Sequence, residues 1–130
     1  MSDIQLIDLK QQLQCIKEGV DQRIQGVLAH GKFILGPEVA ELEKNLALFS
    51  GVKHAVTCAN GTDALLLGLM ALNVRAGDVV FCPSFTFAAT AEVVPCLGAI
   101  PYFVDVNKGD FNLNLESLKA AISSAKKEGL

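Results

Sequence analysis

The sequence predicts an α/β fold in which a parallel sheet is flanked by helices. This fold class rests on two features. Short apolar runs at residues 54–58, 78–82 and 100–104 have the length and composition of buried strands. Between them lie apolar segments at 62–72 and 87–97 that are long enough to be buried helices. Continuous apolar strands separated by helices are typical of a parallel sheet covered on both faces.

The first 50 residues predict two helices rather than part of the sheet. Apolar residues recur at spacings of three and four across residues 10–28, which indicates a helix with one apolar face. These residues are Leu13, Ile16, Val20, Ile24 and Val27. Pro37 suits the first position of a second helix, and Glu38 suits its positive N-terminus. The apolar face of that helix is Val39, Leu42, Leu46 and Phe49, and Ser50-Gly51 predicts its end.

A last helix is predicted near the end of the chain. Its apolar face is Leu115, Leu118, Ile122 and Ala125, and Asn114 is expected to be its N-cap. Residues 126–130 have the character of a helix end that runs into a connection, after which a βα series would continue with another strand. We therefore expect residues 1–130 to be a single incomplete domain. Residues 1–50 would be an N-terminal helical segment, and residues 51–130 the start of the α/β domain.

Composition and charge exclude several classes of protein. Hydrophobic residues make up 51% of the chain and charged residues 19%, which excludes intrinsic disorder. The net charge of −3 offers no basic field for nucleic acid. The longest apolar stretch, 64–72, is far shorter than the ~20 residues of a membrane span. Met1 is not followed by a signal-peptide pattern, so the expected location is the cytoplasm.

The four cysteines predict neither a metal site nor a disulfide framework. None of them are paired at metal-ligand spacing, and a chain expected in the cytoplasm is an improbable place for disulfides. Cys58 and Cys82 lie in strand-like runs, so we expect them to be small buried apolar residues.

The strongest local motif lies at residues 58–65, where a strand is expected to end and a buried helix to begin. The amides at a helix N-terminus are unpaired and carry partial positive charge, which suits a phosphate group. Gly61 would let an anion approach the backbone, and the Thr62 hydroxyl can donate to a phosphate oxygen. The alternative is simple helix capping, because Asn60, Thr62 and Asp63 are all good N-cap residues. The residues alone favour the cap.

A second motif follows the next expected strand, at residues 83–90. Loops at the carboxyl ends of parallel strands are where α/β proteins bind ligands. Phe85 and Phe87 could stack on a flat heterocycle beside a phosphate site. The alternative, which the residues alone favour, is that both rings belong to the core. Asp105 follows the last expected strand, and we expect it to cap the next turn.

Taken together, these segments resemble the DegT/DnrJ-type family of pyridoxal-phosphate sugar aminotransferases. The resemblance covers nearly the whole chain, in the order and spacing of the family's first third. The matching segments are IDL (7–9), FILGPEV (33–39), ANGTDAL (59–65), AGDVV (76–80), PSFTFAATA (83–91) and GAIPYFVDV (98–106). The resemblance implies the N-terminal part of the large domain of a fold type I transferase that uses pyridoxal phosphate. Within the family, the subgroup that aminates 3-keto UDP-sugars is the most similar.

The resemblance implies a role for each site residue. Gly61, Thr62 and Asp63 match the turn that holds the cofactor phosphate, and Phe87 matches the aromatic that stacks on the pyridine ring. The family's Schiff-base lysine and its pyridine-pairing aspartate match positions beyond residue 130. We therefore predict no catalytic residue and no metal site in these 130 residues, and no activity for them alone.

The implied reaction transfers an amino group from glutamate to a keto-sugar nucleotide for surface polysaccharide synthesis. The implied protein is a cytoplasmic homodimer that contacts neither nucleic acid nor membrane. Some members of the family replace the lysine and act as dehydratases, and the sequence does not separate these activities. The competing hypothesis is a non-catalytic remnant or a structural α/β module that binds a phosphorylated ligand or a protein.

The resemblance and simple topology rules predict different sheets. A right-handed βαβ unit would place strand 54–58 beside strand 79–82. The family fold instead implies that 79–82 pairs in parallel with 100–104 and that 54–58 pairs with neither. The helix at 64–72 would then leave much of its apolar surface exposed.

Overall fold

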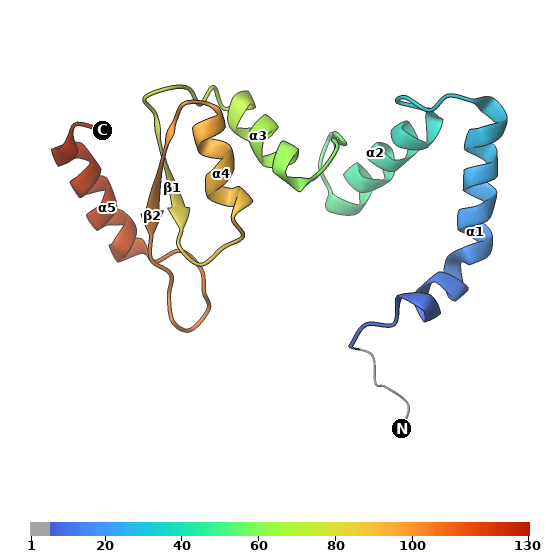
Figure 1. Ribbon diagram of the computed structural model, residues 1–130, viewed down its shortest axis with the longest axis horizontal. Coiled ribbons are helices and arrows are strands. Elements are labelled where there is room, and N and C mark those ends of the chain that lie inside the picture. Colours follow the sequence, from blue (N-terminus) through green and yellow to red (C-terminus); the bar gives the residue numbers. More distant parts are fainter. Residues whose placement is uncertain (1–5) are drawn as a thin grey trace. The chain divides into compact units, whose positions relative to one another are not determined.

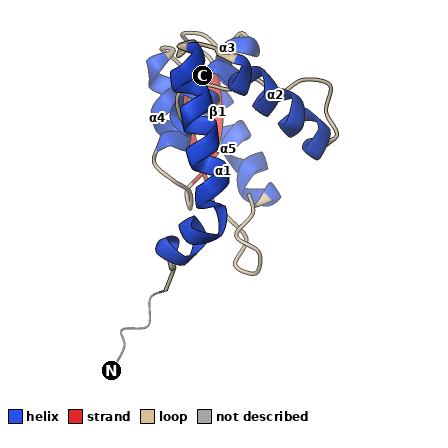
Figure 2. Cartoon of the chain, turned by 90° about the vertical axis from the view of Figure 1, so that its right-hand side faces the viewer, coloured by secondary structure: helices blue, strands red, loops and turns tan. Residues whose placement is uncertain are grey.

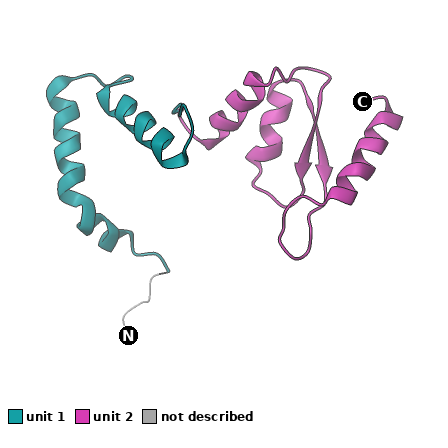
Figure 3. Cartoon of the chain, turned by 180° about the vertical axis from the view of Figure 1, so that it is seen from behind, with its two compact units in different colours: residues 1–57 teal, residues 58–130 magenta. Residues whose placement is uncertain are grey.

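The computed structural model describes residues 6–130 (Figure 1). The chain divides into two compact units, residues 1–57 and residues 58–130 (Figure 3). Each unit has its own architecture. The described residues of the first form helices without strands, and the second contains a parallel sheet with helices.

Unit 1 consists of two helices, α1 (Leu9–His30) and α2 (Pro37–Ser50). The Asp8 side chain accepts a hydrogen bond from the Gln11 amide and caps the start of α1. Pro37 occupies the first turn of α2, and Gly51 ends it in the left-handed conformation with φ 67°. Both helices predicted from periodicity are therefore confirmed, within two residues at each end.

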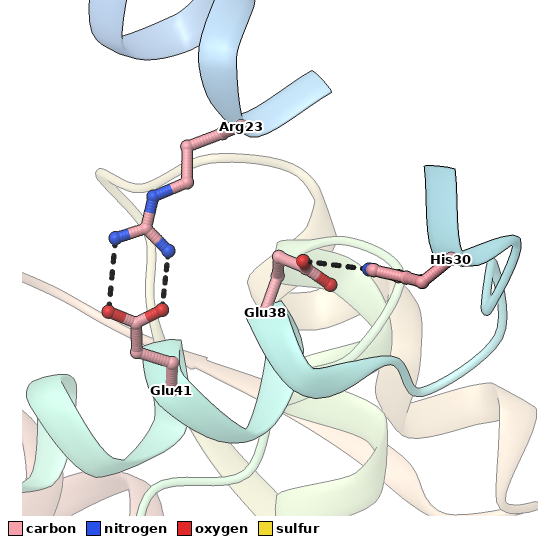
Figure 4. Close-up of polar contacts among 4 residues, drawn as sticks. All are labelled: Arg23, His30, Glu38 and Glu41. Carbon is pink, nitrogen blue, oxygen red and sulfur yellow. Dashed lines mark hydrogen bonds and ion pairs between the residues drawn. The ribbon is translucent and has the colours of Figure 1, made fainter. Parts of the chain in front are cut away.

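Two side-chain bridges join α1 to α2 (Figure 4). Arg23 contacts both carboxylate oxygens of Glu41, with Nη2 3.0 Å from Oε1. About two turns further along α1, His30 Nε2 lies 2.9 Å from Glu38 Oε1. The Lys32 amide donates to His30 Nδ1 at 3.0 Å, so the ring proton lies on Nε2 and is donated to the Glu38 carboxylate. Both contacts join helices that bury few side chains.

The strand expected at residues 54–58 is wrong: the structure shows no strand pairing there. The amide and the hydroxyl of Thr57 both donate to Glu43 Oε1, each at 2.9 Å, instead of to a neighbouring strand. A strand exists only where another strand accepts its backbone hydrogen bonds, and none lies beside this segment among the described residues. The prediction that Cys58 is buried is also wrong, because the residue is exposed.

Unit 2 contains a two-stranded parallel sheet and three helices (Figure 2). The elements in chain order are α3 (Gly61–Ala71), β1 (Val79–Pro83), α4 (Ala89–Cys96), β2 (Ile100–Val104) and α5 (Leu115–Glu128). The strands pair in register from Val79 opposite Ile100 to Pro83 opposite Val104. This confirms the pairing of 79–82 with 100–104, and residues 54–58 do not pair with β1.

Helices cover both faces of β1, as the fold class requires. Cys82 packs into a core with Val93 and Val94 of α4, and α3 packs beside α4. On the opposite face, Val79 and Phe81 line a cavity together with residues of α5. Alternate residues of a strand point to opposite faces, so the continuous apolar run of β1 packs against helices on both faces of the sheet.

Much of the apolar surface of α3 remains exposed, as the family topology implied. The exposed fractions of Leu65, Leu67, Met70 and Leu72 run from 43% to 77%. Across residues 6–130, no helix has both the length and the apolar character needed to cross a bilayer. The same part of the chain contains no cluster of three or more His, Cys, Asp or Glu side chains that could hold a metal ion.

Candidate functional site

The N-terminus of α3 is closed by a reciprocal pair of side-chain contacts. Asn60 Oδ1 accepts a hydrogen bond from the Asp63 amide at 2.9 Å, and Asn60 Nδ2 donates to Asp63 Oδ2 at 3.0 Å. Asn60 is therefore the N-cap, as the capping alternative expected. Its backbone is extended, with φ −164°, as is typical of an N-cap residue.

The cap decides which amides of this turn remain available. The Asp63 amide is taken by Asn60, and the Ala64 amide donates to the Asn60 carbonyl at 3.1 Å. The amides of Gly61 and Thr62 have no acceptor within residues 6–130. A Cβ added at Gly61 would meet no atom within 4 Å, so the space beside Gly61 is open.

This turn fits a phosphate group. Two free amides, the Thr62 hydroxyl and the positive end of the helix dipole provide donors and partial charge for an anion. The turn offers fewer donors to a phosphate than the sequence implied, because the Asp63 amide is bonded to Asn60 and the Asp63 carboxylate accepts a hydrogen bond from the same side chain. Asp63 therefore shapes the turn through Asn60.

Two cysteines lie in different surroundings in this unit. The Cys58 thiol lies beside the start of α3 and donates to the Asn60 carbonyl at 3.3 Å. Cys82 is buried, as predicted, and burial raises the pKa of its thiol. Cys82 therefore behaves as a small core residue, whereas Cys58 is a surface thiol.

The loop after β1 presents two aromatic rings outside the core. Phe85 is 67% exposed and Phe87 is 79% exposed, so the core interpretation of these rings is wrong for the described chain. The hydroxyl oxygens of Thr86 and Thr90 lie 3.0 Å apart and link the loop to the first turn of α4. Phe87 therefore lies on a tethered loop with its ring available for stacking.

The loop after β2 contains a residue that the sequence motifs did not single out. Phe111 has a left-handed backbone with φ 57°, and its ring lies 5.3 Å from that of Phe85. No periodicity or spacing marks this residue, because the contact joins two loops that are distant in sequence. Asp105 caps locally, as expected: its Oδ1 accepts from the Val106 amide at 2.9 Å.

The remaining polar groups of this loop have structural roles. Asn114 Oδ1 accepts from the Ser117 amide at 2.8 Å, which confirms the predicted N-cap of α5. The Asn112 amide donates to Asp110 and holds the pKa of that carboxyl below its usual value.

All the predicted site residues belong to unit 2. In Figure 1 the carboxyl ends of β1 and β2 and the start of α4 lie at the lower side of this unit, and α3 begins at its own lower end. Gly61 and Thr62 begin α3, and Phe87 lies just before α4. The aromatic loop therefore follows the carboxyl end of β1, where α/β proteins bind ligands, and the phosphate-type turn begins the helix that packs beside α4.

Comparison with known proteins identifies the family. Residues 14–128 match the DegT/DnrJ/EryC1/StrS aminotransferase family. The chain belongs to this family. The resemblance in the motifs is thereby confirmed, over nearly the whole length of the chain.

Individual members of the family show how far the similarity extends. The chain is 53% identical over 120 residues to a UDP-2-acetamido-2-deoxy-3-oxo-D-glucuronate aminotransferase of Pseudomonas aeruginosa, covering 92% of this chain and 33% of the relative. A DegT DnrJ EryC1 StrS aminotransferase from Brucella abortus matches with a TM-score of 0.91 and 52% identity, over 98% of this chain and 34% of that one.

A third member was solved with its cofactor. The NtdA protein of Bacillus subtilis, with bound cofactor PMP, matches with a TM-score of 0.84 and 29% identity, over 93% of this chain and 28% of that one. The chain thus spans about a third of the length of the family members it matches. These matches confirm the predicted fold class, the start of the α/β cofactor domain of an aminotransferase.

Proposed function

We propose that this chain provides the phosphate- and ring-binding part of a pyridoxal-phosphate aminotransferase that acts on a keto-sugar nucleotide. The observation that carries the proposal is the pair of free amides at Gly61 and Thr62, in the same compact unit as the exposed ring of Phe87. Family membership and the 53% identity to an aminotransferase of a UDP-linked 3-oxo sugar support this choice of cofactor and substrate.

The amides of Gly61 and Thr62 would bind the cofactor phosphate, together with the Thr62 hydroxyl. Backbone donors need no rearrangement when the anion arrives, since Asn60 already holds the turn. Asp63 contributes by keeping Asn60 in place. Its carboxylate stays within the cap and would not contact the phosphate.

Phe87 would stack on the pyridine ring. A ring that is 79% exposed, on a loop tethered by Thr86 and Thr90, can offer its face to a flat heterocycle. When bound, pyridoxal phosphate supplies the electron sink for amino-group exchange. The residues of this chain bind and orient it, and no side chain among the matched positions moves the proton.

The proposal extends to the amino donor, the product, the assembly and the domain organisation. The amino donor would be glutamate, and the product would enter surface polysaccharide synthesis. The assembly would be a cytoplasmic homodimer. Residues 1–50 would form the N-terminal helical segment, and residues 51–130 the start of the cofactor domain. The 130 residues alone would bind the cofactor without catalysing transamination, because the lysine implied by the resemblance is not among them.

Binding at the α3 turn is tested by Thr62→Val, which removes one charge-assisted donor and should weaken phosphate and pyridoxal phosphate binding by about 1.5–3 kcal/mol. Thr62→Ser keeps the hydroxyl and should bind nearly as the parent does. Thr57→Val is the matched control, since Thr57 donates only to Glu43 of unit 1. The measurement is a titration of amide NMR shifts.

The expected result is a shift of the Gly61 and Thr62 amides with both ligands, while the Asp63 amide, already bonded to Asn60, moves less. If neither inorganic phosphate nor pyridoxal phosphate moves these amides, the turn is a helix cap alone. The structural-module alternative would then describe the chain, and the proposed cofactor site would be wrong.

A further inference from the structure

The loops that follow β1 and β2 begin side by side. Pro83 and Val104 are opposite each other in the parallel register, so both strands end at the same edge of the sheet. The Ser84 amide donates to the Val104 carbonyl at 2.8 Å and extends the pairing one residue beyond β1. A side chain on the second loop can therefore reach the first.

The loop after β2 is a closed structure rather than a loose connection. Val106 and Leu113 form an antiparallel bridge across its base. Above the bridge, the Asn107 amide donates to the Asn112 carbonyl at 2.8 Å. The position of the tip of this loop is therefore set by its own hydrogen bonds.

Phe111 lies in this tip in a conformation that aromatic residues rarely adopt. Its φ of 57° is in the left-handed region, and its amide donates to the Asn107 carbonyl at 3.0 Å. Glycine or asparagine would adopt this conformation more readily, and the loop contains both nearby, at Gly109 and Asn112. The strained position carries a large ring instead, which points to a use for the ring.

The ring of Phe111 contacts the ring of Phe85. Their centroids are 5.3 Å apart and their planes are inclined by 38°, within the range of favourable aromatic pairs. Phe111 is still 59% exposed, so burial in the core of unit 2 does not explain the contact. The pair joins the tip of the closed loop to the loop after β1.

This contact restrains the segment that carries Phe87. Phe85 is anchored on one side of Thr86 by the ring of Phe111, and Thr86 itself is tethered to Thr90 at 3.0 Å. Phe87 lies directly after these anchors and has no ring partner in the described chain. Its backbone is therefore fixed while its ring stays free.

We propose that Phe111 is a positioning residue: through its contact with Phe85, it sets the orientation in which Phe87 stacks on the pyridine ring. This inference rests on the proposed function, because it assigns the stacking partner to the same cofactor. The inference adds Phe111, a residue of a different loop that would not touch the cofactor itself.

The test uses the intact protein with pyridoxal phosphate, and it follows the circular dichroism of the cofactor's absorption band together with the dissociation constant. Phe111→Leu should reduce the band and weaken binding by about three- to ten-fold, the range that one aromatic pair supports. Phe111→Tyr keeps the ring and should restore both. Phe49→Leu, the same change at an exposed phenylalanine of α2, should change neither.

A double substitution separates positioning from direct contact. In the Phe87→Leu background, Phe111→Leu should add no further loss, because its effect passes through Phe87. Additive losses would overturn the inference, as would an unchanged dichroic band in Phe111→Leu. The absence of a proton–proton NMR contact between the Phe85 and Phe111 rings in the parent would also overturn it, whether or not the variants fold.

Failure of the inference is distinguishable from failure of the proposed function. A parent protein that binds pyridoxal phosphate normally, with Phe111→Leu indistinguishable from it, refutes the role of Phe111 alone. A parent that shows no bound cofactor refutes the proposed function, and the inference with it.

Discussion

Replacing Asn60 with alanine tests whether the cap of α3 also prepares the phosphate site. The substitution removes the acceptor of the Asp63 amide and the donor to the Asp63 carboxylate. Losing an asparagine N-cap costs about 1 kcal/mol, within a range of roughly 0.5–2 kcal/mol. The second contact is exposed and adds a few tenths of a kcal/mol at most. The free energy of unfolding should therefore fall by about 1–2 kcal/mol.

Asn114→Ala is the matched control for this change. Asn114 caps α5 in the same way, with its Oδ1 2.8 Å from the Ser117 amide, so the loss of stability should be similar. Only Asn60→Ala should also weaken phosphate binding, because it disorders the turn at Gly61 and releases the Asp63 carboxylate beside the anion. Asn60→Ser keeps the acceptor and should lose little stability.

Urea denaturation followed by far-ultraviolet circular dichroism gives the stabilities, and the NMR titration gives phosphate affinity. In thermal unfolding, a 1 kcal/mol loss corresponds to a fall in Tm of about 4–8 °C for a unit of the size of residues 58–130. The reasoning is refuted if Asn60→Ser destabilises as much as Asn60→Ala. It is also refuted if Asn60→Ala and Asn114→Ala leave phosphate affinity equally unchanged.

Two further predictions concern one residue pair in each unit. Gly98→Ala should lower the free energy of unfolding more than Gly77→Ala does, as measured by urea denaturation. Both glycines have a positive φ, 72° at Gly98 and 92° at Gly77, but only a Cβ at Gly98 would meet another atom closely, at 3.0 Å from Ala76 Cβ. Equal losses for the two variants would contradict the role of that contact. In unit 1, the hydrogen bond from His30 lowers the pKa of Glu38, so this pair contributes stability above the carboxyl's ordinary pKa and loses it as pH falls through the lowered value. Glu38→Gln should therefore reduce the dependence of the unfolding free energy on pH at acid pH. A dependence as steep as the parent's would show that this pair does not cause the loss of stability in acid.

The helices and their ends were predictable from sequence because they depend on neighbours along the chain. The apolar spacing of α1, Pro37 at the start of α2 and the cap at Asn114 involve residues within about four positions of one another. Such contacts form with little loss of chain entropy, so they are visible in the order of residues. The family motifs likewise identified the α3 turn and the Phe87 loop as candidate cofactor-binding segments.

The sheet depended on contacts that local pattern does not determine. Residues 54–58 have the composition of a strand, yet no strand lies beside them and the Thr57 amide turns to Glu43. The simplest βαβ rule would have paired them with β1, whereas β1 pairs with β2. Strand formation is decided by which segment supplies the opposing hydrogen bonds, and that partner can be distant in the chain.

By itself, then, the sequence determined the helices, the caps, the family and the turn that suits a phosphate. Only the tertiary structure decided which donors of that turn remain free, since Asn60 takes the amide of Asp63 and leaves those of Gly61 and Thr62. It also brought Phe111 onto Phe85, across two loops that are distant in sequence. The physical reason is the same in both cases: a hydrogen bond or a ring contact is settled by distance and direction in space, which residue order alone does not specify.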